Sequence, residues 1–180
     1  MDEEPNPTKD ILYEVINQIG ESKIHQEIAD SNHEKIINEI IELSKEKIQQ
    51  LDGEQENNLA KFLTAFLHYL LTIVLIPSQR KIQKDAIDID IVVPNLKTLE
   101  TNPKNAILIC IPEIHEYTIE SQIKEMNSLQ PNRENIWYVT EKNIKEKTYS
   151  INNQTFWKII NDINRFLEST KTRQFRFFKV

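Results

Sequence analysis

The sequence contains very little glycine or cysteine, and both shortages limit what the chain can do. Only Gly20 and Gly53 occur in 180 residues, and neither lies in a G-x-G context, which excludes a glycine-rich phosphate-binding loop. Cys110 is the single cysteine, so an internal disulfide and a thiolate zinc site are excluded, and a reducing compartment is favoured. Residues 1–4 are mainly acidic, unlike the basic start of a signal peptide. We therefore expect a cytoplasmic protein.

Charge is divided unevenly along the chain. The net charge is −6, but residues 1–56 hold fifteen Asp or Glu against five Lys, a balance of −10, which leaves +4 for the remainder. Residues 171–180 contain four Lys or Arg and no acid. An acidic beginning and a basic end indicate two surfaces with different partners, rather than a uniformly basic nucleic-acid binder.

Apolar residues at helical spacing predict three short helices near the beginning: residues 9–19, a weaker segment around residues 24–28, and residues 33–51. We therefore divide the chain into an acidic helical N-terminal segment, residues 1–53, and an α/β domain, residues 54–180. Helices this short need a packing surface, so the segment either docks on the domain or binds a partner.

Residues 59–76 form the most hydrophobic stretch. Eighteen residues is near the lower limit for spanning about 30 Å of hydrocarbon. Lys61, Ala65, His68 and Thr72 give one narrow, less apolar stripe at helical spacing. This pattern favours a helix buried on most sides in a protein core, and we expect no membrane association.

Two consecutive strands are predicted between residues 86 and 113, and the first carries acidic side chains. Ile87, Ile89 and Ile91 alternate with Asp88 and Asp90. Because alternate side chains of a strand leave opposite faces, we expect the three isoleucines in a core and the two carboxylates side by side on the other face.

The remaining elements complete an α/β pattern. Residues 106–111 are apolar on both faces, as in a central strand. A helix at residues 118–129 and a strand at residues 136–140 follow, which together predict a parallel βαβ unit. A charged loop at residues 142–148 leads to a helix at residues 156–167. The predicted fold class is α/β, with a small central mixed sheet flanked by helices and an acidic helical N-terminal arm.

In this order the elements resemble a degenerate PD-(D/E)XK, or restriction-endonuclease-like, nuclease fold. The resemblance covers residues 34–139 and rests on the element order and the run Asp90–Val93 (DIVV). It implies an Asp on one strand, an acid-x-Lys triplet on the next and a helical Glu nearby. In such nucleases the acids hold a divalent metal, and the Lys helps position the attacking water.

The second strand departs from that pattern. The triplet would fall on residues 110–112, Cys-Ile-Pro, or one residue earlier, and no register supplies both an acid and a lysine. Glu113 is an acid at the strand's end, and His115 stands where a lysine would follow. Asp88, Asp90 and Glu113, with His115, are therefore candidate metal ligands. The alternative is that the two aspartates are a solvated strand face.

The basic tail is a second candidate site. Aromatic and cationic residues interleave there, which is typical of a surface that stacks bases and holds phosphates. Residues 174–180 also fit an edge strand that uses cations to discourage pairing, and an acidic protein partner is a third possibility. The candidate nucleic-acid or partner-binding residues are Arg173, Phe175, Arg176, Phe177 and Lys179.

Together these features favour a non-catalytic interaction or scaffold subunit, built on a degenerate nuclease-like core and associated with a nucleic-acid-processing assembly. This hypothesis includes a protein partner, nucleic acid held by the basic tail, and no cofactor. It predicts no cleavage of DNA or RNA with Mg²⁺ or Mn²⁺. The alternative is a divalent-metal-dependent nuclease of DNA or RNA, for which Mg²⁺ would be the cofactor.

Overall fold

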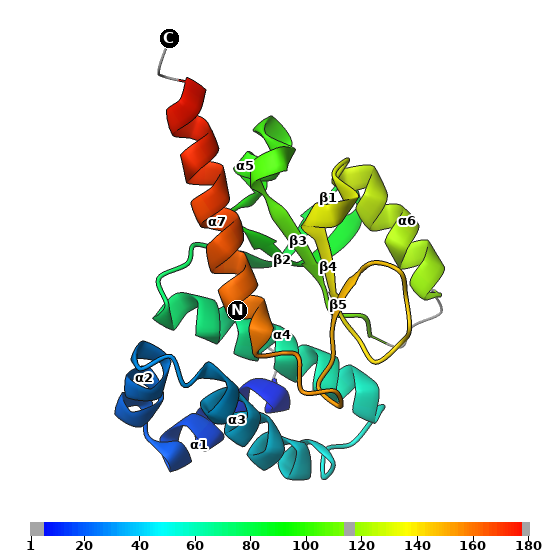
Figure 1. Cartoon of the computed structure of the whole chain (residues 1–180). Coiled ribbons are helices and arrows are strands. Elements are labelled where there is room, and N and C mark those ends of the chain that lie inside the picture. Colours follow the sequence, from blue (N-terminus) through cyan, green and yellow to red (C-terminus); the bar gives the residue numbers. More distant parts are fainter. Residues whose placement is uncertain (1–5, 114–117, 178–180) are drawn as a thin grey trace, which may run out of the picture.

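A five-stranded mixed sheet lies at the centre of the molecule, with helices on both faces (Figure 1). The computed structural model describes residues 6–113 and 118–177. In chain order the elements are α1 (Pro7–Ile19), α2 (Glu21–Ala29), α3 (His33–Ile48), α4 (Gln55–Ile73), β1 (Gln79–Lys84), β2 (Ile87–Val93), α5 (Leu96–Thr101), η1 (Pro103–Asn105), β3 (Ile107–Cys110), α6 (Ile119–Leu129), η2 (Arg133–Asn135), β4 (Ile136–Val139), β5 (Lys147–Tyr149) and α7 (Lys158–Phe177).

The strands lie in the order β1-β2-β3-β4-β5. β1, β2 and β3 are antiparallel neighbours, whereas β3, β4 and β5 run parallel. The crossover through α6 joins β3 to β4, so the predicted parallel βαβ unit and the predicted α/β fold class are confirmed.

Each face of the sheet has its own hydrophobic cluster. The larger cluster joins one face to α4, α7 and the N-terminal helices, and includes Ile91, Ile109 and Val139. The smaller cluster lies under α5 and α6 and includes Leu108 and Tyr138. β3 contributes to both clusters, and all four of its residues are buried, as the apolar sequence of a central strand predicts.

The N-terminal helices pack on the rest of the chain. α1 begins two residues earlier than its spacing suggested, because Asn6 caps it and Pro7 occupies its first position, where proline's missing N–H costs nothing. Its buried side chains, such as Leu12 and Val15, join the same cluster as α4. Within the part of the chain that the structure describes, α4 is a core helix, and no helix is long and apolar enough to cross a membrane.

A hairpin that the sequence analysis did not predict precedes the acidic strand. β1 pairs with β2 through a two-residue turn, Asp85-Ala86, in which both residues have positive φ (51° and 63°). Such a turn matches the twist of the strands it joins and usually contains glycine or asparagine. Neither occurs here, so the usual sequence signal is missing.

The expected strand at residues 174–180 is wrong for its described part. α7 continues as a helix to Phe177, and residues 178–180 lie outside the described residues. The sequence from residue 158 onward contains no proline or glycine, so a helix already nucleated propagates at little cost. The expected loop at residues 142–148 is also partly wrong, because β5 begins at Lys147.

The expectation for the acidic strand is wrong in one respect. Ile91 packs in the larger cluster, but Ile89 and Ile87 pack in the smaller one, so the three isoleucines do not share a face. The break falls at Asp90. Opposite it on β1, Lys81 has a left-handed backbone (φ 47°) that interrupts the regular hairpin.

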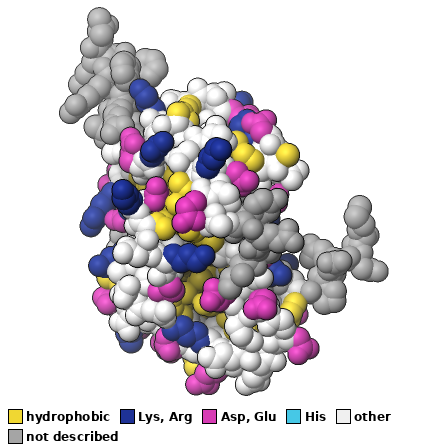
Figure 2. Space-filling model, turned by 90° about the vertical axis from the view of Figure 1, so that its right-hand side faces the viewer, with side chains coloured by type: hydrophobic (Ala, Val, Ile, Leu, Met, Phe, Trp, Pro, Cys, Tyr) yellow, Lys and Arg dark blue, Asp and Glu magenta, His cyan; other side chains and the backbone are white. Residues whose placement is uncertain are grey.

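Charge is segregated at the level of whole elements. Residues 7–48, which contain α1, α2 and α3, hold nine Asp or Glu against five Lys, whereas α7 has five Lys or Arg against two acids. On the face shown in Figure 2, by contrast, acidic and basic side chains are interspersed.

Candidate functional site

Lys81 joins two of the predicted site residues. Its ammonium Nζ lies 2.8 Å from Asp90 Oδ1 and 3.3 Å from Glu113 Oε1. Lys81 comes from β1, Asp90 from the neighbouring strand β2, and Glu113 from the segment just after β3. Three neighbouring parts of the sheet thus bring two acids and a lysine together.

Asp90 is largely enclosed, and its carboxylate is held from two sides. Oδ1 accepts from Lys81, and Oδ2 accepts from the backbone N–H of Ile111 at 2.7 Å. Burial raises the pKa of Asp90, although the Lys81 charge and the Ile111 N–H oppose this shift by stabilising the carboxylate. Protons therefore compete for this carboxylate at a higher pH than for an ordinary aspartate.

Lys81 itself is held in its charged form. Burial alone would lower the pKa of Lys81, but the attraction of Asp90 and Glu113 outweighs it, and the net shift is upward. The side chain keeps 48% of its surface exposed. The ammonium therefore contacts both the carboxylates and the solvent from which a substrate would approach.

The other predicted ligands lie apart from this cluster. Asp88 is exposed, and its Oδ1 accepts from Gln83 Nε2 at 3.2 Å. His115 lies outside the described residues. Among the residues that are described, no three side chains of His, Cys, Asp or Glu gather as a metal site. Asp90 and Glu113 thus form a two-carboxylate centre.

A hollow of about 420 Å³ adjoins Glu113 at the ends of β3 and β4. Its floor is apolar, and the amino-terminal half of α4 forms one wall. Glu141 fixes another wall: one oxygen accepts from the N–H groups of Ile151 and Asn152 at 2.8 and 3.2 Å, and the other from Ser150 Oγ at 2.5 Å. Of the cluster formed by Lys81, Asp90 and Glu113, it is Glu113 that lines this hollow.

The predicted tail residues lie on a helix, far along the chain from this centre. Arg173, Phe175, Arg176 and Phe177 belong to α7, and Lys179 lies outside the described residues. Their proposed role in binding stays a prediction.

Lys81 is a site residue that the sequence pattern did not predict, although the hairpin register identifies it. If Asp85-Ala86 is taken as a two-residue turn, Lys84 pairs with Ile87, and each step back along one strand is a step forward along the other. Three steps further, Lys81 stands opposite Asp90. The family resemblance places the lysine in the second strand, whereas here it comes from β1.

Comparisons with known proteins give one likeness of structure. No family model matches the chain, and no curated protein is significantly similar in sequence. A solved complex of the restriction endonuclease PspGI with its substrate DNA is similar in structure, with a TM-score of 0.50 and 16% identity, over 91% of this chain and 93% of that chain. At this level of identity the likeness concerns the fold alone: the chain has a restriction-endonuclease-like fold.

Proposed function

We propose that this protein is a divalent-metal-dependent phosphodiesterase acting on nucleic acid, with Asp90 and Glu113 as metal-binding carboxylates and Lys81 as the cationic group beside them. The observation that carries the proposal is the contact of one ammonium with both carboxylates. The second strand lacks the lysine that the fold resemblance calls for, and β1 supplies one that contacts both carboxylates. The main reason to expect an inactive core is thereby removed.

The donor set fits a hard cation. Mg²⁺ is commonly bound by one or two carboxylates and completes its coordination with water and substrate phosphate oxygens. Such an ion would supply charge stabilisation at the phosphorus and a nucleophilic water. Asp90 is kept in orientation by the Ile111 N–H, and Glu113 borders the hollow through which a strand would approach. Lys81 would hold a phosphate oxygen or the attacking water by hydrogen bonds.

A second candidate is the non-catalytic scaffold, and the same contact favours it in a different way. Lys81 already compensates both carboxylates, so the cluster is also a complete internal ion-pair network that needs no metal. In that case the core is structural, and a protein partner would use other surfaces. The two candidates differ in whether a divalent ion binds.

The deciding experiment measures metal binding and cleavage on the same samples. Mn²⁺ binding is followed by electron paramagnetic resonance, and cleavage of plasmid DNA, single-stranded DNA and RNA is assayed with Mg²⁺ and Mn²⁺. The variants are Glu113→Gln, Lys81→Met and the control Asp88→Asn, which changes an exposed acid outside the cluster.

If the protein is a nuclease, we expect Mn²⁺ binding and cleavage in the wild type and in Asp88→Asn. Glu113→Gln should weaken both, and Lys81→Met should abolish cleavage while retaining or strengthening Mn²⁺ binding, because a nearby positive charge is removed. Wild-type protein that neither binds Mn²⁺ nor cleaves any substrate would contradict the proposal and favour the scaffold.

A further inference from the structure

We infer that a second hollow, at the opposite end of the parallel strands, holds the phosphodiester backbone of nucleic acid through Lys104 and Arg165, and that α7 extends this surface. The inference rests on the proposed nucleic-acid substrate but not on the catalytic role of Lys81, Asp90 or Glu113. It adds a site for binding, separate from the site of cleavage.

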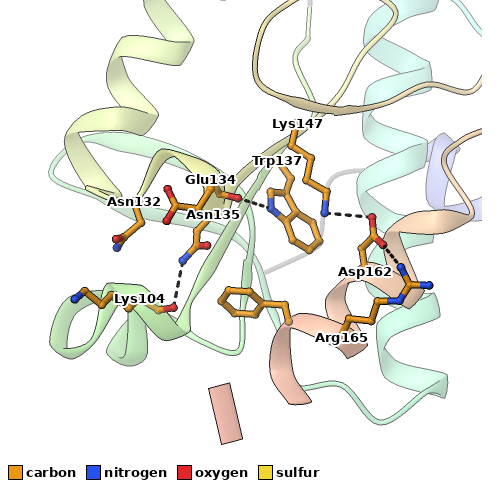
Figure 3. A pocket seen from close by; sticks show the side chains of 9 residues that line it. Lys104, Asn132, Glu134, Asn135, Trp137, Lys147, Asp162 and Arg165 are labelled. Carbon is orange, nitrogen blue, oxygen red and sulfur yellow. Dashed lines mark hydrogen bonds and ion pairs between the residues drawn. The ribbon is translucent and has the colours of Figure 1, made fainter. Parts of the chain in front are cut away.

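The hollow has a volume of about 670 Å³ and lies between η1, η2, β4, β5 and α7 (Figure 3). Hydrogen bonds fix its floor. Asn135 Nδ2 donates to the backbone oxygens of Pro103 and Lys104, and the buried Gln130 donates to Pro103 O and Ala106 O. These bonds tie the turns before β3 and β4 together, so the hollow is preformed.

Two exposed cations flank the hollow on opposite sides (Figure 3). Lys104 comes from η1 and Arg165 from α7. Among the described residues, none forms a hydrogen bond or ion pair with the Lys104 ammonium. Arg165 is 79% exposed and contacts Asp162 only at 3.6 Å. Both cations are therefore available to a ligand.

Two acids, Glu134 and Asp162, line the hollow; Glu134 is exposed, and Asp162 is already compensated within the chain. Asp162 accepts from the Tyr149 hydroxyl at 2.7 Å and pairs with Lys147 at 3.2 Å. Lys147 in turn lies 3.8 Å from the ring centroid of Trp137. Lys104, Lys147 and Arg165 against Glu134 and Asp162 leave the lining with a net charge of +1. The Lys147–Asp162 pair is fixed by contacts within the chain.

The geometry favours backbone phosphates over bases. Trp137 is 3% exposed, one of its faces is covered by Lys147, and Phe166 packs edge-on against it at 6.3 Å between centroids. No free ring face of this tryptophan remains for base stacking. Cations without a stacking platform contact phosphates and read no sequence.

The helix carries the same charge onward. Lys158 and Arg165 are separated by seven residues, close to two full turns, so these positions fall on one face of α7. Three further cationic residues, Lys171, Arg173 and Arg176, follow in its sequence. In Figure 1 the helix runs away from the N-terminal helices and past the sheet. A polyanion seated at the hollow would therefore follow a basic helix in a chain whose net charge is −6. This charge complementarity favours a polyanion, and the proposed nucleic-acid substrate is one.

The test is binding of a short labelled DNA duplex, measured by fluorescence anisotropy in EDTA over a range of salt concentrations. The variants are the double substitution Lys104→Ala with Arg165→Ala, the charge reversal Lys104→Glu, and the control Lys124→Ala, an exposed lysine of α6 on the other face of the sheet. Circular dichroism checks that each variant is folded.

We expect the double variant to bind about tenfold more weakly and its slope of log K against log salt to fall by about two, since each phosphate contact contributes about one. Lys104→Glu reverses a charge and should therefore weaken binding more than removal of that charge alone would. Lys124→Ala should bind as the wild type does. Because the binding assay is run in EDTA, without metal or cleavage, failure of cleavage and failure of this surface are read separately.

Binding by the double variant that matches the wild type in affinity and salt slope would overturn the inference. So would an equal loss in Lys124→Ala, because the effect would then be one of general charge. Polyglutamate that displaces the labelled duplex better than an unlabelled duplex of equal length would also overturn the inference, in favour of an acidic protein partner.

Discussion

The two ends of the sheet use lysine in opposite ways. Beside the carboxyl end of β3, Lys81 joins two largely buried acids, whose side chains are 17% and 14% exposed. At the other end, Lys104 is exposed, and its ammonium has no hydrogen-bond or ion-pair partner among the described residues. A paired lysine beside enclosed carboxylates fits chemistry on a bound ion, and an unpaired lysine at a rim fits attraction of a polyanion. The surroundings, not the residue type, separate the two roles.

The largest expected effect tests whether the two ends belong to one cooperative unit. Phe66 is fully buried between Phe62 and Phe156, with ring centroids 5.7 and 6.0 Å away, and so joins α4 to the segment before α7. Phe66→Ala should cost about 3–5 kcal/mol of unfolding free energy, measured by urea titration. Circular dichroism and tryptophan fluorescence should give coincident transitions. Separate transitions would show that the ends unfold independently.

The next effect compares the two lysines directly. Lys81→Met leaves Asp90 enclosed with one hydrogen bond and no counter-charge, which should cost about 1–3 kcal/mol. Lys104→Met removes an exposed, unpaired charge and should change stability by less than about 0.5 kcal/mol. Urea titrations of both variants at one pH measure the two losses of unfolding free energy. Equal losses would contradict the proposed difference between the paired and the unpaired lysine.

A smaller effect concerns the interior of the second hollow. Lys147→Met removes a contact with the Trp137 ring and an ion pair with Asp162. Both are partly exposed, so we expect a loss of about 0.5–1 kcal/mol. Lys145→Met, an exposed residue in the preceding loop, is the matched control and should be nearly neutral. Thermal unfolding of Lys147→Met and Lys145→Met gives the difference between their losses of stability.

The smallest effect is a pH dependence that belongs to one end only. Burial raises the pKa of Asp90 in the folded state, so the folded protein binds this proton more tightly than the unfolded chain. Between the usual aspartate value of about 3.9 and the raised value, stability therefore rises as pH falls. The difference in unfolding free energy between wild type and Asp90→Asn should shift in favour of the wild type from pH 7 toward pH 4. A shift in the other direction would mean that the Lys81 charge outweighs burial.

Much of the fold could be predicted from local pattern. The alternation in Ile87–Val93 and the apolar run Ala106–Ile111 identified the two central strands, and the spacing to residues 136–140 gave the parallel unit. These elements are long or strongly patterned, so neighbouring residues alone determine them. Asp90 and Glu113 were predicted as site residues for the same reason: acids at the ends of apolar runs stand out.

What could not be predicted depended on contacts across the chain or on rarer backbone shapes. β1 is a surface strand with a weak pattern, and its turn uses two non-glycine residues at positive φ. The aromatic alternation at residues 175–177 indicated a strand, but the helix that begins at Lys158 overrides it. The role of Lys81 follows only after the hairpin is known, because its partners are nine and thirty-two residues away.

The left-handed backbone at Lys81 has a further consequence for how copies of the protein meet. β1 is an outermost strand of the sheet, and such a strand presents unpaired N–H and C=O groups to which another chain can add. An extended partner needs a regular row of these groups, and the conformation at Lys81 (φ 47°) breaks the row near its middle. The residue that contacts the carboxylates therefore also blunts the edge of the sheet and protects it from aggregation.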